Sequence, residues 1–117
     1  MSGATISPHG GTLVSRWAPA QERQRWLGEL AKLPRITLNR REISDLEMIA
    51  IGTFSPLEGF LREADYESVV SRMRLANDLP WTIPVTLAVT AQEEHNYHPG
   101  DDVALCEESG KPLAILH

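Results

Sequence analysis

Two histidines spaced three residues apart, His95 and His98, resemble a metal-binding pair more than any other side chains of this sequence. Asp101 and Asp102 follow them, and two imidazoles with two carboxylates would suit a zinc ion. The segment nevertheless has the character of a turn between two strands, because a Pro-Gly pair interrupts it and polar residues are expected on an exposed turn. We favour a solvated loop over a metal site, and leave a contact with a partner protein open as a third interpretation.

Arg40 and Arg41 form the second candidate site, because paired guanidinium groups just ahead of a helix can bind a sulfate or a nucleotide phosphate. The expected helix begins at Ser44, and the N-terminus of a helix attracts anions. In the alternative interpretation both arginines pair with Glu42, with Asp45 or with an adjoining domain. We favour this alternative.

His9 and Cys106 are the remaining side chains that could act on a ligand. His9 lies in a Pro-His-Gly-Gly turn, where it could orient a ligand or a neighbouring domain, but we favour a hydrogen-bonded turn residue. The two glycines do not form a phosphate-binding loop, because no Lys-Ser or Lys-Thr pair follows them. Cys106 has no histidine beside it and is followed by acidic residues, which disfavours a reactive thiolate. As the single cysteine, it also excludes an internal disulfide.

Composition places the chain among ordinary globular proteins. Of its 117 residues, 42% are apolar and 23% are charged. The sequence contains no run of about 18 apolar residues that could span a membrane, and the start, Met1–Thr5, lacks the pattern of a secretory signal. We therefore expect a single domain over residues 1–117 of a cytoplasmic protein, with no membrane partner.

Charge is distributed unevenly within the net charge of -5. Residues 1–74 are nearly balanced, whereas Lys111 is the one basic residue of 75–117, which holds seven acidic residues. A nucleic-acid-binding protein normally presents a basic surface to the phosphate backbone. We therefore expect no nucleic-acid partner.

Hydrophobic spacing predicts three helices in the first two thirds of the chain. The first covers about 19–32 and has proline in its first turn. A capping box of Ser44 and Glu47 starts the second helix, about 44–51, which is apolar on most sides and should be buried. The third helix, about 64–75, places four apolar residues on one face. These four are Tyr66, Val69, Val70 and Met73.

Alternating residues predict strands, most of them in the last third of the chain. A short strand around Ile36 precedes the second helix, and the alternation in 85–90 predicts another strand. Val103–Leu105 and Pro112–Leu116 then form a hairpin around a Ser-Gly turn. Helices followed by strands, without βαβ alternation, indicate an α+β fold. The last strand has no visible partner to close it, so we expect the chain to be truncated at its C-terminus.

The most distinctive segment runs from Ser44 to Phe60 and combines the capped helix with an aromatic corner punctuated by proline and glycine. The corner could line a small-molecule pocket, but we favour a packing role because two phenylalanines bury a large apolar area. This segment resembles the signature of the N-terminal domain of ATP sulfurylase (sulfate adenylyltransferase). The matching residues, for which we expect a structural role, are Ser44, Asp45, Leu46, Glu47, Phe54, Ser55, Pro56, Leu57, Gly59 and Phe60.

Four further blocks resemble the same family in the same order, so that the similarity covers the chain from about residue 7. They lie at 8–16, 65–70, 81–87 and 99–116. The resemblance implies a PUA-like, partly closed β-barrel with flanking helices. It also implies a partner, the catalytic adenylyltransferase domain, within an enzyme that is a homo-oligomer.

In that family the whole enzyme joins sulfate to the α-phosphate of ATP and releases pyrophosphate, with magnesium accompanying the nucleotide. The catalytic signature is Gln-x-Arg-Asn-Pro-x-His-x-x-His, and neither Gln21 nor Gln24 leads into it here. We therefore assign no catalytic, cofactor-binding or metal-binding residue to this chain and expect a scaffold. Two alternatives stay open: the family's enzymatic activity applies directly, or the chain is a free-standing PUA-like RNA-binding module.

Overall fold

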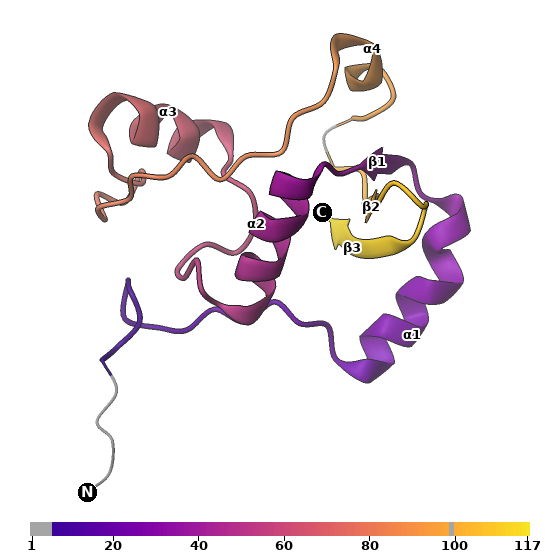
Figure 1. Cartoon of the computed structure of the whole chain (residues 1–117), viewed down its shortest axis with the longest axis horizontal. Coiled ribbons are helices and arrows are strands. Elements are labelled where there is room, and N and C mark those ends of the chain that lie inside the picture. The colour runs from indigo at the N-terminus through magenta and orange to yellow at the C-terminus, as the bar shows by residue number, and fades with distance from the viewer. Residues whose placement is uncertain (1–5, 99) are drawn as a thin grey trace, which may run out of the picture. The chain divides into compact units, whose positions relative to one another are not determined.

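The computed structural model describes residues 6–98 and 100–117 (Figure 1). Met1–Thr5, and Pro99 of the expected turn, lie outside the described residues. The chain folds into two compact units, and we describe each by itself. The first unit contains Met1–Trp17 and Ser44–Leu87, and the second contains Ala18–Ile43 and Ala88–His117. A single domain over the whole chain stays a prediction.

The second unit is built on a three-stranded sheet in the order β1-β2-β3 (Figure 1). β2 (Val103–Cys106) is central, pairing in parallel with β1 (Arg35–Thr37) and antiparallel with β3 (Pro112–Leu116). All four residues of β2 are buried, as expected of a strand with neighbours on both sides. Gly110 turns the hairpin with φ of +90°, a conformation that glycine adopts without a steric penalty. The predicted first strand and the predicted hairpin are therefore confirmed.

Two helices belong wholly to the second unit. α1 (Ala20–Glu29) continues into the 3-10 turn η1 (Leu30–Lys32), which confirms the predicted first helix. Within α1, all of whose residues are described, no side chain is buried. The short helix α4 (Ala91–Glu94) follows Thr90, whose hydroxyl accepts a hydrogen bond from the Glu93 amide at 3.1 Å. None of the described helices is long and apolar enough to cross a membrane.

The helix α2 (Arg40–Ile51) begins four residues earlier than the sequence analysis predicted. Its start is capped by Asn39 and Glu42, which exchange side-chain-to-backbone hydrogen bonds. Ser44 and Glu47 lie inside the helix, away from its first turn. The predicted start at Ser44 is therefore wrong, because a second capping box lies five residues upstream.

The hydrophobic core of the first unit gathers residues from α2, from residues 52–60, which we call the signature corner, from α3 (Glu63–Arg72) and from the segment that follows α3. Half-buried apolar residues of the corner and of 79–81 pack around it. This core explains why the corner is rich in large apolar side chains. Its buried members are Ile49, Leu57, Val69, Leu75 and Val85.

The predicted third helix is confirmed as α3, whereas the predicted strand over 85–90 is wrong. Among the described residues, the segment 85–90 forms no strand, and the Val85 carbonyl accepts a hydrogen bond from the Leu61 amide at 2.8 Å. Of the four apolar residues expected on one face of that helix, Val69 is buried, and Met73 lies just beyond the last residue of α3. The other three, Tyr66, Val70 and Met73, are exposed.

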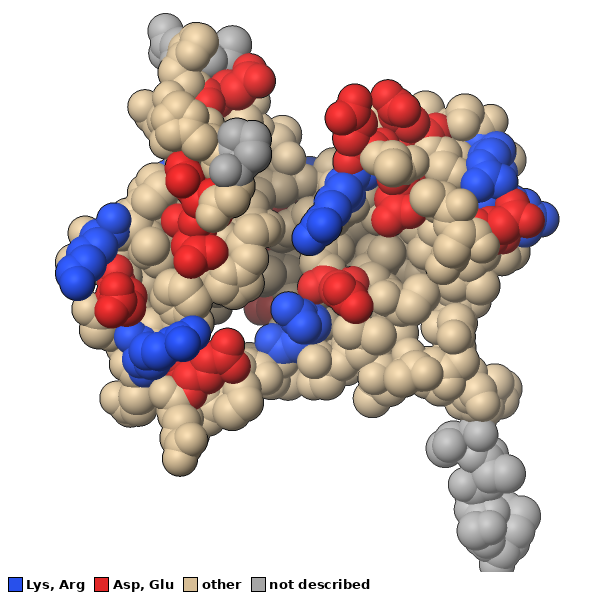
Figure 2. Space-filling view, turned by 180° about the vertical axis from the view of Figure 1, so that it is seen from behind, with Lys and Arg blue, Asp and Glu red and all other residues tan. Residues whose placement is uncertain are grey.

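Charged residues of both signs are interspersed on the face drawn in Figure 2. Lys and Arg side chains lie there singly or in small groups, with Asp and Glu close to them. Phosphate-binding surfaces instead concentrate basic residues into a patch or stripe. The drawn face therefore has no continuous basic patch among its described residues.

Candidate functional site

The signature corner begins where α2 ends, at Gly52. Gly52 has φ of +85°, a left-handed conformation that glycine adopts readily. The Thr53 amide donates back to the Met48 carbonyl at 2.9 Å, which closes the last turn of the helix. A Cβ at Gly52 would lie 2.7 Å from Cδ1 of Leu13 and 3.1 Å from the carbonyl oxygen of Val14. Glycine is therefore required here both by its conformation and by the close approach of the N-terminal arm.

Ser55 joins the signature corner to this N-terminal arm. Its buried hydroxyl donates to the Gly52 carbonyl at 2.6 Å and accepts from the Val14 amide at 2.9 Å. Two residues later the Arg16 amide donates to the Ala50 carbonyl at 3.0 Å. The peptide bond between Ser55 and Pro56 is cis. The buried Ser55 hydroxyl therefore holds the corner and the N-terminal arm together and does not face a ligand.

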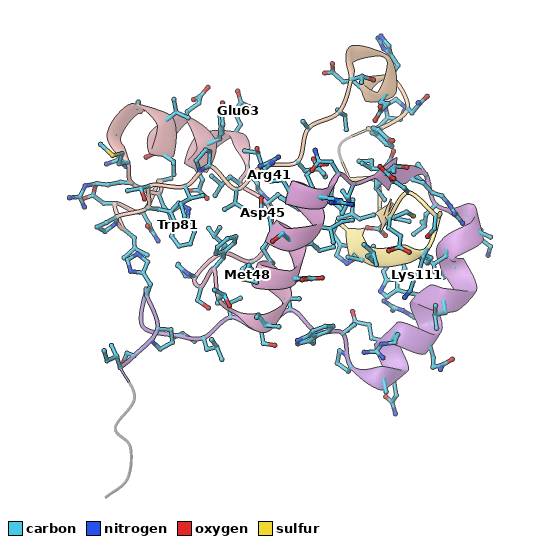
Figure 3. The ribbon with its side chains drawn as sticks, in the orientation of Figure 1. Arg41, Asp45, Met48, Glu63, Trp81 and Lys111 are labelled. Atoms are coloured by element: carbon cyan, nitrogen blue, oxygen red, sulfur yellow. The ribbon has the colours of Figure 1, made fainter. Side chains whose placement is uncertain are left out.

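Aromatic rings form the outer side of the corner. Phe54 meets Trp81 edge to face with ring centroids 6.0 Å apart, and the His9 ring lies 5.9 Å from Trp81 on a tilted plane. His9 Nε2 lies 2.7 Å from the Pro80 carbonyl oxygen, and the indole N–H of Trp81 donates to the Ile83 carbonyl at 2.7 Å. Figure 3 shows Trp81 in the segment that follows α3. His9 is thus held as a hydrogen-bonded turn residue, the role that the sequence favours.

The remaining signature residues are placed by packing. Leu57 is buried in the core, and Phe60 packs against it. Pro56 contacts the N-terminal turn, since a Cβ at Gly10 would lie 3.0 Å from its ring. Asp45 and Met48 lie along α2 (Figure 3). The signature therefore builds a corner held by packing and by internal hydrogen bonds.

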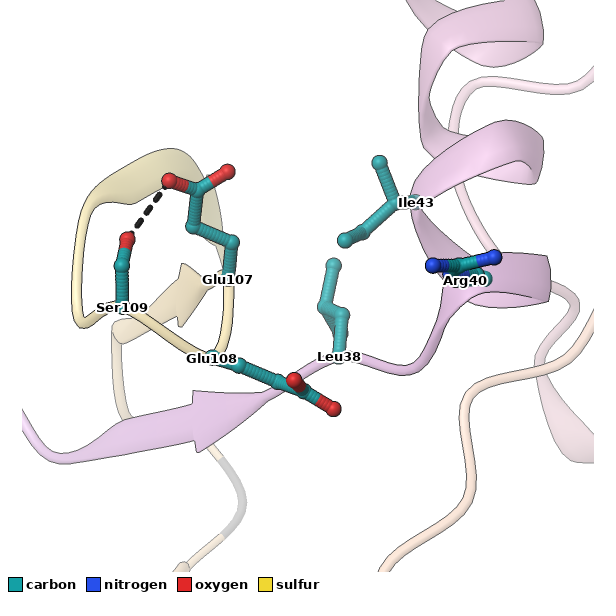
Figure 4. Close-up of a pocket in the computed structure, with 6 residues that line it drawn as sticks. All are labelled: Leu38, Arg40, Ile43, Glu107, Glu108 and Ser109. Carbon is teal, nitrogen blue, oxygen red and sulfur yellow. Dashed lines mark hydrogen bonds between the residues drawn. The ribbon is translucent and has the colours of Figure 1, made fainter.

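The candidate anion site at Arg40, which the sequence analysis did not favour, lies in the second unit, in the first turn of α2. Arg40 lines a shallow pocket whose other walls include two glutamates of the hairpin (Figure 4). Glu107 and Glu108 oppose the binding of a sulfate or phosphate there by like-charge repulsion. The pocket also has few hydrogen-bond donors for an anion, because the apolar side chains of Leu38 and Ile43 form part of its wall. Its chemistry does not support the anion site.

The His95 and His98 pair lies in the connection between α4 and β2. His95 is the residue at which α4 ends, and the His98 amide donates to Asp101 Oδ2 at 2.9 Å. The Asp101 amide donates back to the His98 carbonyl at 3.0 Å, so the aspartate closes the turn. Among the described residues, no three side chains of metal-ligating type converge.

Glu42 is a buried carboxylate that the sequence analysis did not single out as functional. One oxygen accepts from the Asn39 amide at 3.0 Å and the other from the Ala88 amide at 3.2 Å. Glu42 thereby joins the start of α2 to the segment that leads to α4. The Asn39-x-x-Glu42 spacing was a visible signal, but the bond to Ala88 connects residues 46 positions apart and has no local signature.

Tyr97 and Cys106 are the other potentially reactive groups of the second unit. The Tyr97 hydroxyl donates to the Arg35 carbonyl at 2.7 Å. Burial, and secondarily the negative charge of Glu93, raise the pKa of Tyr97 above its usual 10.0. The Cys106 thiol is buried in β2. Both groups are held within the fold and act as structural residues.

The comparisons with known proteins agree with this geometry. The profile of the PUA-like domain family matches residues 6–117. The chain therefore belongs to the PUA-like domain family.

Three relatives show which proteins carry this domain. The chain is 50% identical to the sulfate adenylyltransferase of Synechocystis over 97% of its own length and 29% of the relative. It is 47% identical to the sulfate adenylyltransferase of Symbiobacterium thermophilum over 95% of its length and 28% of the relative. A solved structure described as a hexameric APS kinase from Thiobacillus denitrificans has a TM-score of 0.84 and 35% identity. That match covers 95% of this chain and 22% of the other.

The chain spans less than a third of the curated relatives that it matches. It corresponds to the N-terminal part of these sulfate adenylyltransferases. The family resemblance and the α+β, PUA-like fold predicted from the sequence are confirmed.

Proposed function

We propose that this chain is a scaffold domain of a sulfate adenylyltransferase and packs against a separate catalytic domain. That catalytic domain would bind ATP with magnesium and transfer the adenylyl group to sulfate. The chain itself would contribute no catalytic residue. The parent enzyme would be cytoplasmic and a homo-oligomer, and the relative described as hexameric supports the second of these properties.

One observation carries the proposal. Two sulfate adenylyltransferases are 47–50% identical to nearly all of this chain, and more than two thirds of the length of each lies outside the match. The matched part uses its signature corner for packing, since Ser55 and Leu57 are buried and Trp81 has its N–H bonded internally. Such a corner can hold a domain rigid, but it offers no group aimed at a phosphoryl centre.

The test is sulfate-dependent exchange of pyrophosphate into ATP. The purified chain should show no exchange above background. The remainder of the Synechocystis enzyme, made without the matching region, should bind the chain and gain stability from it. Exchange by the chain alone at a rate comparable with the intact relative would overturn the scaffold role.

The solved structure favours a second candidate, a scaffold within a polypeptide that carries APS kinase activity. Its 35% identity and TM-score of 0.84 show that the same domain accompanies a protein with that description. Binding decides between the two candidates. The chain should bind the remainder of the Synechocystis enzyme more tightly than the remainder of the Thiobacillus protein, and the reverse order would favour the second candidate.

An RNA-binding role is the alternative of a different class. The interspersed charges of Figure 2 and the net charge of -5 weigh against it. A filter-binding assay with structured RNA at low salt tests it directly. Salt-sensitive binding would support an RNA partner, and failure to bind at low salt would eliminate this role.

A further inference from the structure

The exposed apolar residues at α3 are one feature of the first unit that its hydrophobic core does not use. Three residues, which we call the α3 face, are Tyr66, Val70 and Met73, with 44%, 62% and 63% of their surface exposed. Tyr66 and Val70 lie four residues apart on one side of α3, and Met73 follows the helix as its left-handed C-terminal cap. The buried residue beside them, Val69, already connects α3 to the core. The α3 face is therefore additional to what the fold of this unit requires.

An apolar pocket adjoins the C-terminal end of the α3 face. It is lined by Pro80, Trp81, Thr82 and Ile83, and Ile83 is 52% exposed. The Trp81 amide donates to the Met73 carbonyl at 3.0 Å, which fixes the pocket segment beside the end of α3. Because the indole N–H of Trp81 is bonded to the Ile83 carbonyl, the pocket offers a partner mainly apolar contact.

We propose that the α3 face and the Trp81 pocket together form the surface on which the catalytic part of the longer polypeptide docks. This inference rests on the proposed function, because the catalytic part is the occupant it names. The partner surface would carry an apolar side chain for the pocket and an apolar strip for α3. It would also place basic residues opposite Glu63 and Glu67, which border the α3 face one helical turn apart (Figure 3 labels Glu63).

The modest size of this surface favours the rest of the same polypeptide over a second copy of the chain. A stable interface between separate proteins buries roughly 1,200–2,000 Å² in total. Three exposed side chains and a pocket lined by four residues are far fewer than the roughly 20–30 residues that each side of such an interface contributes. A covalently linked partner binds at a high effective concentration and therefore needs less contact area. The relatives supply that linked partner, because over two thirds of their length lies outside the match.

Oxidation of Met73 by hydrogen peroxide tests the inference at a side chain of the α3 face. One sample is the isolated chain, and the other is a chimera in which this chain replaces the matching region of the Synechocystis sulfate adenylyltransferase. Met73 should oxidise several-fold more slowly in the chimera, because a docked partner would cover its thioether. Met48, which lies in α2 outside the α3 face, serves as an internal reference whose rate should stay nearly constant.

A matched pair of variants identifies the surface. Val70→Asp should return Met73 in the chimera to the oxidation rate of the isolated chain, because a carboxylate cannot dock into an apolar interface without a large desolvation cost. Leu27→Asp places the same charge on α1 of the second unit at a similar exposure of 54%, and it should leave Met73 protected. Thermal melting of both variants as isolated chains should match the unsubstituted chain, which verifies that each variant folds.

The outcomes separate this inference from the proposed function. Protection elsewhere in the chimera, with Met73 still reactive, would overturn the α3 face but keep the scaffold role. No protection anywhere would overturn both. Protection of Met73 that rises with the concentration of the isolated chain would identify a second copy as the occupant, and would also overturn the inference.

Discussion

Asn39 and Glu42 exchange hydrogen bonds across the first turn of α2. The Asn39 Oδ1 atom accepts from the Glu42 amide at 2.8 Å, and the Glu42 Oε1 atom accepts from the Asn39 amide at 3.0 Å. The second carboxylate oxygen of Glu42 accepts from the Ala88 amide at 3.2 Å. One residue pair thus determines where the helix starts and attaches a segment that is distant in the sequence.

Asn39→Ala should lower the free energy of unfolding by about 1 kcal/mol, the usual cost of losing an N-cap side chain. Glu42→Ala should cost more, roughly 1–3 kcal/mol, because it also leaves the amide of Ala88 without its partner. Urea denaturation measures both. Ser44→Ala is the matched control, since Ser44 lies inside the helix beyond its first turn, and it should change stability by less than about 0.5 kcal/mol. A larger loss at Ser44 than at Asn39 would contradict the observed helix start.

Gly52→Ala should destabilise the first unit by about 1–2 kcal/mol, because alanine pays a steric cost at φ of +85°. The new methyl group would also press on Leu13 at 2.7 Å. Gly28→Ala provides the control. Gly28 lies in α1, and a methyl group added there would meet nothing within 4 Å, so alanine should stabilise the helix by about 0.5–1 kcal/mol. Opposite shifts of the two urea midpoints are expected, and equal shifts would be inconsistent with the positive φ at Gly52.

Tyr97 should make stability depend on pH in the alkaline range. Burial and the charge of Glu93 raise its pKa in the folded chain above 10.0, so the fold favours the neutral phenol. This contribution is fully present below pH 10 and is lost as the pH rises through the higher pKa of the folded state. In a Tyr66→Phe background Tyr97 is the remaining tyrosine, and its ultraviolet titration should have a midpoint above 10.0.

The control for this prediction is Tyr97→Phe. Near neutral pH the variant should lose about 1 kcal/mol, because the hydrogen bond to the Arg35 carbonyl disappears. Above pH 10 the difference between the variant and the unsubstituted chain should shrink. A difference that grows with pH would show that the ionised phenol is the stabilised form, contrary to the raised pKa of Tyr97.

Local signals in the sequence predicted much of the fold. The proline before α1 and the Ser-Gly turn between β2 and β3 act through short-range backbone preferences, so the elements beside them were predicted correctly. The start of α2 was mispredicted because two capping boxes compete within nine residues of sequence, at Asn39 and at Ser44. The bond from Glu42 to Ala88, which the upstream box alone can make, is a tertiary contact and has no local pattern.

Residue alternation gave a wrong prediction for 85–90, because alternation alone does not show whether a neighbouring strand is present to pair with. Val85 is buried as a strand residue would be, but its neighbour is the core and not another strand. The spacing of Tyr66, Val69 and Val70 predicted the helix correctly, but it does not show which of these side chains the core buries. The candidate sites show the same limitation. His95 and Arg40 have side chains that could bind a metal ion or an anion, but the structure places His95 at the end of α4 and Arg40 at the start of α2.

Ser55→Ala tests whether the signature corner is held by its hydroxyl. The substitution removes the acceptor of the Val14 amide and the donor to the Gly52 carbonyl, so it should cost about 1–3 kcal/mol. Hydrogen exchange should show faster exchange of the Val14 amide, because the N-terminal arm loses an attachment to the corner. Ser109→Ala is the control, since its exposed hydroxyl bonds only to exposed groups of the hairpin, and it should shift stability by less than about 0.5 kcal/mol. An unchanged Val14 amide in Ser55→Ala would mean that the arm is held by packing around Gly52 instead.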